Sequence, residues 1–246
     1  MSELERERGN AVAAVPVAQV QSLVRSERVG AELSGSRRVA LAVKRVADFC
    51  ASALGLVLLS PILLLIGLIV RMESPGPALF RQERIGQGSV PFTFYKFRTM
   101  ADGNDPAIHQ KYVRQLITQG SEDLKGDTGS FKIENDPRVT RFGRILRRTS
   151  IDELPQLLNV LAGDMSLVGP RPPLRYEVEL YSARALRRLE CRPGITGLWQ
   201  VSGRCQTTFD EMVGLDIEYV DDWSLGLDLR ILARTVPVVF GRKGAW

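Results

Sequence analysis

Two adjacent carboxylates, Asp152 and Glu153, stand in a stretch of the sequence that is rich in arginine. Ser150, three residues before Glu153, has the spacing of a capping box, and leucines at helical spacing follow it. The pattern predicts that both carboxylates lie in the first turn of a helix over 151–162, where exposed amide groups favour negative charge. Taken alone, the pair is best interpreted as helix capping, so any chemical role must come from the residues around it.

The arginines near this pair are held on backbone that glycine and proline restrict. Arginine presents a flat, permanently charged group that binds phosphate through two N–H donors at once. Singly, each would be interpreted as a surface charge; together they also fit preset phosphate clamps, and both interpretations remain open. They are Arg147 and Arg148, Gly169-Pro170-Arg171-Pro172-Pro173, Arg192-Pro193-Gly194 and Gly203-Arg204.

An ionised aspartate among arginines is suited to attack on a phosphoanhydride. Carboxylates act as covalent nucleophiles towards phosphoryl groups, and guanidinium groups offset the charge on the group that is transferred. The adjacent glutamate suits Mg2+, which binds one or two carboxylates together with substrate phosphates. An aspartate is already ionised at neutral pH, so this chemistry needs no histidine base.

The histidine and cysteine content argues against other kinds of site. His109 is the only histidine and lies in a polar stretch, which disfavours hydrolases with a histidine base and histidine-rich metal sites. Cys50, Cys191 and Cys205 show no paired spacing. We therefore expect free thiols in a reducing compartment and neither a zinc site nor a disulfide framework.

Length and charge set the outer limits on function. The chain has 246 residues, of which 44% are apolar and 25% charged, which is typical of a globular protein and not of a disordered chain or a multi-pass channel. The net charge is +5, and arginine supplies 27 of the 33 basic residues. This excess favours a phosphate-bearing partner, which on composition alone is nucleic acid, anionic lipid or a nucleotide.

One segment is apolar enough to enter a membrane. Residues 49–70 carry no charge, and such a length in helical form crosses a hydrocarbon core of roughly 30 Å. Ser60-Pro61 lies near its middle, where proline predicts a kink and the serine hydroxyl can satisfy a freed carbonyl. Basic residues flank both ends, which favours the same cytoplasmic side for both. The sequence thus favours a re-entrant helix-break-helix over a spanning helix or a buried soluble one.

The remaining segments predict an α+β fold that is mainly helical. Two β-prone runs around residues 86–89 predict a small β-hairpin within 79–100. Residues 138–148 place four apolar side chains on one stripe, which indicates an ordinary surface helix or an amphipathic helix in the lipid interface. The stripe consists of Val139, Phe142, Ile145 and Leu146.

Further helices are predicted over 105–119, 174–190, 208–222 and 226–240, the last interrupted by Pro237. A loop is expected over 120–137, and Gly- and Pro-rich connections over 163–173 and 192–205. The chain is thereby divided into a mobile tail over 1–36, a re-entrant membrane helix over 37–72 and a cytoplasmic catalytic domain over 73–246.

These motifs, in this order, resemble those of the bacterial sugar transferases known as monotopic phosphoglycosyl transferases, in particular the small members that begin exopolysaccharide synthesis. The resemblance covers about residues 37–240, and its most specific motifs are the Asp-Glu-Leu-Pro-Gln and Gly-Pro-Arg-Pro blocks. The matching stretches are Lys44-Arg45, Ser60-Pro61, Lys96–Met100, Asp152–Leu157, Gly163–Pro172, Arg192–Gly197 and Gly203-Arg204.

The resemblance implies that the chain transfers a sugar 1-phosphate, of galactose or glucose, from a UDP-sugar to undecaprenyl phosphate. Asp152 would be the catalytic nucleophile, forming a phosphoaspartyl intermediate with release of UMP, and Glu153 would act in catalysis by binding Mg2+. Arg147, Arg171 and Arg204 would bind the substrate phosphates. Cys205 stands where relatives often carry asparagine, and the resemblance gives no function to the stretch 101–135.

The resemblance also implies a re-entrant membrane segment at the bacterial inner membrane, with the catalytic domain on the cytoplasmic face. Lys44, Arg45, Ser60 and Pro61 would anchor this segment. The implied partners are a UDP-sugar, undecaprenyl phosphate and membrane lipid, with no nucleic acid, and a homo-oligomer is left open.

Two alternatives compete with this interpretation. A multi-pass phosphoglycosyl transferase needs many apolar spans, and the sequence has one. A membrane-anchored basic module that binds acidic lipid or nucleic acid without catalysis would spread its arginines over exposed faces, and Asp152 would be dispensable in it.

Overall fold

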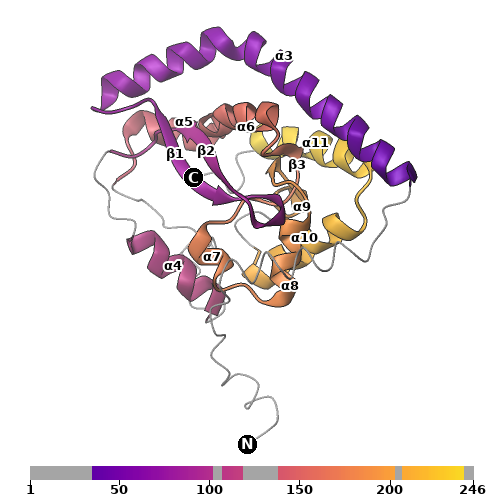
Figure 1. The fold of residues 1–246 in the computed structure, drawn as a ribbon. Helices are drawn as coiled ribbons and strands as arrows, with labels where there is room; N and C mark the ends of the chain where they lie inside the picture. The colour runs from indigo at the N-terminus through magenta and orange to yellow at the C-terminus, as the bar shows by residue number, and fades with distance from the viewer. Residues whose placement is uncertain (1–34, 102–106, 119–137, 203–206, 241–246) are drawn as a thin grey trace, which may run out of the picture.

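The computed structural model describes residues 35–101, 107–118, 138–202 and 207–240. Several sequence expectations lie outside these residues: nearly all of the tail over 1–36, most of the stretch 101–135 with the loop over 120–137, and the pair Arg204 and Cys205. Figure 1 shows one long helix arching over a body of shorter helices, with a β-hairpin against that body. The described chain is mainly helical with a little β-structure, which agrees with the predicted fold class.

The long helix, α3, runs from Gly35 to Glu73 and contains Pro61. A proline has no amide to donate to the carbonyl four residues earlier, here that of Val57. This carbonyl instead accepts a hydrogen bond of 2.8 Å from the Ser60 hydroxyl, as the sequence suggested. The predicted break is wrong in form, because the helix is continuous and changes direction as an arch (Figure 1).

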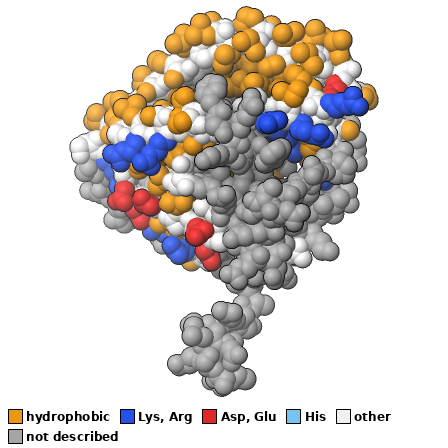
Figure 2. All heavy atoms as spheres, turned by 180° about the vertical axis from the view of Figure 1, so that it is seen from behind, with side chains coloured by type: hydrophobic (Ala, Val, Ile, Leu, Met, Phe, Trp, Pro, Cys, Tyr) orange, Lys and Arg blue, Asp and Glu red, His pale blue; other side chains and the backbone are white. Residues whose placement is uncertain are grey.

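Most of α3 is exposed. Among the described residues it is the only helix long and apolar enough to cross a membrane. Only Asp48, Ser52, Ile66 and Val70 in it are buried, whereas the core helix of a soluble protein is covered over a whole apolar face. Figure 2 shows apolar side chains gathered along the edge of the molecule that α3 forms.

The N-terminal part of α3 is attached to the body by polar contacts. Lys44 Nζ donates to the carboxylate of Asp228 at 2.6 Å. The Asp48 carboxylate accepts a hydrogen bond of 2.7 Å from the Ser166 hydroxyl, and both of these residues are buried. Buried groups of this kind require partners, so the contacts fix this part of the helix to the body.

The C-terminal part of α3 is attached to the same body by apolar packing. Ile66 and Val70 form a buried cluster with Phe97 and Leu146. The Arg98 side chain donates to the carbonyls of Val70, at 3.3 Å, and Ser74, at 2.6 Å, which lie at the end of the helix. Both ends of the arch are therefore held on one body.

The β-hairpin is confirmed. Strands β1 (Leu79–Ile85) and β2 (Pro91–Phe97) are antiparallel, with Leu79 opposite Phe97 and Ile85 opposite Pro91. A short 3-10 turn, η1 (Gln87–Ser89), connects them. Gly88 in this turn has φ 66°, a conformation that glycine adopts without strain.

The rest of the body consists of short helical segments. Their bounds are α4 Ala107–Thr118, α5 Arg141–Thr149, η3 Ile151–Gln156, α6 Leu157–Ala162, α7 Arg175–Val178, α8 Ala183–Leu186, η4 Arg187–Glu190, α9 Leu198–Ser202, α10 Phe209–Asp221 and α11 Leu225–Phe240. The helices predicted over 105–119 and 208–222 are confirmed as α4 and α10. The helix predicted over 174–190 is wrong, because that stretch forms three short pieces. Helix α11 continues through Pro237, so the predicted interruption is also wrong.

The stripe predicted on α5 is correct only in part. Phe142 and Leu146 pack into the cluster under α3, whereas Ile145 is 56% exposed. Val139 precedes the helix and forms an isolated bridge with Met100. Within α5, Phe142 and Leu146 face the core whereas Ile145 faces away from it. Helix α5 therefore presents an apolar side chain to solvent beside α3.

Two three-residue strands, β3 (Ser166–Val168) and β4 (Gly194–Thr196), pair in parallel and were not predicted. They lie within the Gly- and Pro-rich stretches expected to be connections. Three residues are too few to show an alternating pattern, so no periodic signal marks these strands in the sequence.

Candidate active site

Asp152 and Glu153 lie at the start of the 3-10 helix η3, and not in the first turn of an α-helix. Ser150 ends α5 and begins η3 in a left-handed conformation (φ 57°, ψ 17°), and its side chain makes no capping hydrogen bond. The predicted capping box is therefore wrong. The tight turn at Ser150 places the end of α5 against η3, which brings Arg147 close to Asp152.

Asp152 is a buried carboxylate, with 6% of the residue exposed. Burial, and next the charge of Glu153, raise the pKa of its carboxyl from 3.8 to about 6, although Lys96 and Arg147 oppose the rise. At neutral pH the group is therefore mostly ionised but separated from bulk water. An ionised, poorly hydrated oxygen is suited to act as a nucleophile without a general base.

Lys96, on β2, is a cation of the site to which the sequence analysis gave no role. Burial lowers the pKa of its ammonium group from 10.5 to about 8, against the pull of Asp152. Lys96 follows Phe92 and Phe94 on one face of the strand, and Phe94 is buried. A charged residue on the buried face of a strand was the signal that could have identified it.

Arg147, predicted to bind phosphate, is held in place by a hydrogen bond. Its Nε donates to the hydroxyl of Thr99 at 2.8 Å, and Thr99 is buried directly after β2. The end of α5 and the end of β2 thus present Arg147 and Lys96 to the same carboxylate.

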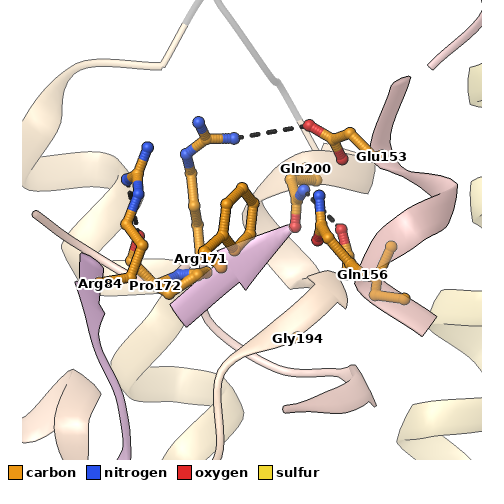
Figure 3. A pocket seen from close by; sticks show the side chains of 9 residues that line it. Arg84, Glu153, Gln156, Arg171, Pro172, Gly194 and Gln200 are labelled. Atoms are coloured by element: carbon orange, nitrogen blue, oxygen red, sulfur yellow. Dashed lines mark hydrogen bonds and ion pairs between the residues drawn. The ribbon is translucent and has the colours of Figure 1, made fainter. Parts of the chain in front are cut away.

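Arg171 and Glu153 form the open side of the site. Arg171 Nη1 lies 3.8 Å from Glu153 Oε1, and their side chains are 42% and 30% exposed. Figure 3 shows both beside a small pocket, which Arg84, Phe94, Gln156, Ile195 and Gln200 also line. Glu153 faces this pocket while Asp152, one residue earlier, is buried next to Lys96.

Close packing of two backbone segments fixes the loop that carries Arg171. Gly169 N–H donates to the Thr196 carbonyl at 2.8 Å, and Gly194 N–H donates to the Pro170 carbonyl at 2.9 Å. A Cβ on Gly194 would lie 2.0 Å from the Gly169 nitrogen, so only glycine fits there. The Gly-Pro-Arg-Pro and Arg-Pro-Gly motifs, which are well separated in sequence, therefore form one rigid unit.

The predicted arginines do not all meet at the site. Arg147 and Arg171 do, together with Asp152 and Glu153. Arg148 and Arg192 are exposed. Arg204 lies outside the described residues, and its predicted role stays a prediction.

The residues predicted to anchor the membrane segment have identifiable partners. Lys44 contacts Asp228, and Arg45 donates to the carbonyls of Val160 and Leu161 at 2.6 and 2.9 Å, at the end of α6. These contacts attach α3 to the body. Ser60 and Pro61 lie on the exposed middle of α3. Membrane anchoring by these residues stays a prediction.

The donor set for Mg2+ is small. No group of three or more histidine, cysteine or acidic side chains capable of holding a metal occurs in the described part of the chain. Asp152 and Glu153 nevertheless fit Mg2+, because this ion commonly takes one or two carboxylates and completes its shell with substrate phosphates and water. Of the two, Glu153 is the more exposed and faces the pocket.

The chain is similar to known proteins. The family model described as bacterial sugar transferase matches residues 39–242. The chain is 39% identical over 215 residues to the exopolysaccharide production protein ExoY of Rhizobium meliloti, covering 87% of this chain and 93% of that protein.

Two further relatives carry names that describe an activity. The chain is 47% identical over 214 residues to the UDP-glucose:undecaprenyl-phosphate glucose-1-phosphate transferase of Caulobacter vibrioides, covering 82% of this chain and 72% of that protein. It is 42% identical over 206 residues to the galactosyl transferase CpsE of Streptococcus agalactiae. That alignment covers 83% of this chain but only 44% of CpsE, so the chain spans less than half the length of this relative.

Proposed function

The chain belongs to the bacterial sugar transferase family and is a phosphoglycosyl transferase, and we propose that it transfers a sugar 1-phosphate from a UDP-sugar to undecaprenyl phosphate through a covalent intermediate on Asp152. The observation that carries the proposal is a buried carboxylate, ionised at neutral pH, on which two cations, Lys96 and Arg147, act. The names of the relatives support glucose or galactose as the sugar and a role in exopolysaccharide production, in which this transfer is proposed as the first membrane step.

In the first step a carboxylate oxygen of Asp152 attacks the sugar-proximal phosphorus of the UDP-sugar. A new oxygen–phosphorus bond forms, and the phosphoanhydride bond breaks with its electron pair on the departing UMP. The phosphoaspartyl group retains the sugar. The leaving phosphate takes up the charge that the carboxylate loses, so no proton transfer is required, and the described residues of the site accordingly include no histidine.

In the second step a phosphate oxygen of undecaprenyl phosphate attacks the same phosphorus. The bond to Asp152 breaks, the carboxylate is regenerated, and the sugar is left on a lipid diphosphate. Lys96 and Arg147 flank the carboxylate in both steps and offset charge on the phosphoryl group as it is transferred. Arg171, on its rigid loop, adds a cation at the pocket that Glu153 faces, and Arg204 is proposed as a further one.

Mg2+ bound at Glu153 would supply further neutralisation of the substrate phosphates. Glu153 suits this role because its carboxylate is partly exposed and faces the pocket, whereas Asp152 must keep an oxygen free for attack. The Arg171 side chain lies beside Glu153 and limits the excess negative charge there when the metal is not bound.

The attachment of α3 supports a re-entrant placement at the inner membrane with the active site on the cytoplasmic face. A helix that spans the bilayer puts its ends on opposite sides. The ends of α3 instead contact one body, through Lys44 at one end and through Ile66 and Val70 at the other. The exposed apolar middle then enters the membrane and returns, and the basic residues stay at the cytoplasmic surface.

A basic binding module without catalysis is not favoured by any observation. Such a module would use its cations to bind an anionic partner. A carboxylate buried next to those cations would compete with the partner, and burial of its charge would cost stability. Burial of this kind is typical of catalytic groups whose pKa must be adjusted.

Exchange between UMP and the UDP-sugar tests the proposal. Purified protein is incubated with UDP-glucose or UDP-galactose, Mg2+ and labelled UMP, without a lipid acceptor. Because the first step is reversible, label should enter the UDP-sugar, and Asp152→Asn should abolish this exchange. Asp164→Asn, which changes an exposed carboxylate, is the control and should exchange normally. Transfer to polyprenyl phosphate without any exchange would indicate direct transfer and would overturn the covalent intermediate.

A further inference from the structure

Arg84, on β1, is a buried cation that lines the same pocket as Arg171 and Glu153. It is 6% exposed. Its Nη1 donates to the Pro172 carbonyl at 2.9 Å and its Nη2 to Gln82 Oε1 at 3.0 Å. The guanidinium carbon lies 5.3 Å from the centre of the Phe94 ring, so one face of the group is covered by an aromatic side chain.

The Nε–H of Arg84 is buried and has no hydrogen-bond partner in the described part of the chain. A buried donor on a charged group is costly to leave unpaired, so an unpaired one requires an explanation. Among the described residues, no acidic side chain forms an ion pair with Arg84. The charge of Glu177 acts on Arg84 from a longer distance and raises its pKa. The Arg84 guanidinium therefore has a positive charge without an ion-pair partner and an Nε–H without an acceptor among the described residues.

Arg84 also lies next to another cation. Figure 3 shows the Arg84 and Arg171 side chains pointing to the same side of the pocket, with Pro172 between their attachment points. Burial, and next the charge of Arg171, lower the pKa of Arg84 to about 10, so it remains protonated at neutral pH. Two like charges at one small site are mutually unfavourable, and a bound anion would relieve this repulsion.

The pocket also offers neutral polar groups. Gln156 is 2% exposed. Gln200 Nε2 donates to the Ile195 carbonyl at 3.2 Å, whereas its Oε1 is buried and has no partner in the described residues. The pocket is therefore lined by two guanidinium groups, two carboxamides and one carboxylate, a set suited to a phosphate with its metal ion.

We propose that Arg84 and Arg171 together bind the nucleotide phosphate that leaves as UMP, while Lys96 and Arg147 hold the phosphoryl group that Asp152 attacks. This assignment rests on the function proposed above. It follows from the positions of the cations: Lys96 and Arg147 act directly on Asp152, whereas Arg84 and Arg171 share the pocket that Glu153 faces. Stabilisation of the leaving phosphate lowers the barrier to breaking the phosphoanhydride bond.

The assignment is tested by comparing the affinities of the purified protein for UMP and for uridine, measured by calorimetry with Mg2+ present. If Arg84 binds the phosphate, Arg84→Gln should weaken UMP binding about tenfold or more and leave uridine binding unchanged, because only UMP carries the anion. If Arg84 only holds the Pro172 loop in place, Arg84→Gln would weaken the binding of UMP and of uridine by the same factor.

Arg81→Gln is the matched control. Arg81 lies on the same strand and its guanidinium is 6.0 Å from the Tyr95 ring centre, but it is exposed and does not line the pocket. Its substitution should leave the ratio of UMP to uridine affinity unchanged. The wild-type exchange reaction is run alongside, so that failure of the proposed function, seen as no exchange in the wild type, is distinguished from failure of the Arg84 assignment.

Arg84→Lys keeps the charge but loses the forked donors, and it is the variant used if Arg84→Gln does not fold. It should reduce the ratio of UMP to uridine affinity by a smaller factor than Arg84→Gln does, and it should slow cleavage of the phosphoanhydride bond in the first step. An unchanged ratio in either folded variant would overturn the assignment. Failure of both variants to fold would assign Arg84 a structural role and would overturn it as well.

Discussion

At the level of single residues, Asp152 is a carboxylate whose burial costs stability. The pKa of Asp152 is raised from 3.8 to about 6, so the folded state binds a proton more tightly than the unfolded state does. The stability associated with this proton is present below pH 4 and is lost as the pH rises through 6. Native proteins retain such a cost at functional positions, where activity requires a destabilising group.

Asp152→Asn is therefore expected to make the protein more stable at pH 7.5 while abolishing transfer. The gain should be up to about 3 kcal/mol, because the pKa difference is about two units and each is worth about 1.4 kcal/mol. It should shrink between pH 6 and 4 and vanish below. Thermal unfolding of both proteins across this pH range measures it.

Asp164→Asn serves as the control for that measurement, because Asp164 is exposed and its substitution should give no gain that depends on pH. A variant Asp152→Asn that is less stable than the wild type at pH 7.5 would mean that the carboxylate is a structural ion-pair partner and not a destabilising catalytic group.

Sequence reasoning identified site residues that lie within distinctive motifs and missed those whose role comes from burial. Asp152, Glu153, Arg147 and Arg171 were predicted, and they meet at the site. Lys96 and Arg84 are contributed by the hairpin, far from Asp152 in sequence, and only the packing of β1 and β2 shows that they face the site.

At the scale of elements, the pairing of β3 with β4 is the feature that holds the Arg171 loop. Neither strand could be predicted, since each has three residues and the pairing depends on backbone contact at glycine instead of on an apolar pattern. The hairpin, in contrast, has strands of seven residues and a glycine-containing turn, and its position was predicted. An alternation of apolar and polar residues predicts long strands. It does not predict strands that pair through close contact of two backbones.

Gly194→Ala is expected to separate β3 from β4. The added Cβ would lie 2.0 Å from the Gly169 nitrogen, so the backbone must move. We expect a loss of about 2–4 kcal/mol in the free energy of unfolding and a larger relative loss of activity, because the Arg171 loop loses its support. Denaturant unfolding and the exchange assay measure the two effects.

Gly226→Ala is the matched control for this substitution. Gly226 lies in α11, and its added Cβ meets nothing nearer than the Ser224 hydroxyl at 4.0 Å. Alanine there should leave stability unchanged or raise it slightly, since alanine is the better helix former. Equal behaviour of the two variants would show that close contact at Gly194 does not hold the loop.

At the scale of the whole molecule, the arch of α3 over the body determines how the protein can meet a membrane. The exposed apolar residues of α3 are joined by Ile145 of α5, Leu158 of α6 and Leu229 of α11, which are 56%, 40% and 68% exposed. Apolar composition predicted the segment, and the flanking charge predicts that both of its ends lie on the cytoplasmic side. A break at Pro61 was predicted, and not a continuous helix. The Ser60 hydroxyl donates to the carbonyl that Pro61 leaves without a backbone donor, and this hydrogen bond allows a bend in place of a break.

Cysteine labelling in cells tests this placement. Val39→Cys and Pro77→Cys lie beyond the two ends of the apolar segment, and both are exposed positions. In a chain with Cys50 and Cys205 changed to serine, both new thiols should react with an impermeant reagent only after the inner membrane is opened. The remaining Cys191 should react poorly, because burial raises its pKa to about 12. Reaction of one site from each side would show that α3 spans the membrane.

Peptide mass spectrometry tests the covalent intermediate on Asp152 directly, in enzyme quenched in acid shortly after mixing with UDP-sugar and without a lipid acceptor. We expect a sugar-phosphoryl group on the peptide that contains Asp152. This group should disappear when polyprenyl phosphate is added and should never form in Asp152→Asn. Rapid transfer to the lipid with an unmodified Asp152 at every time point, or an adduct on another residue, would contradict the covalent intermediate on Asp152.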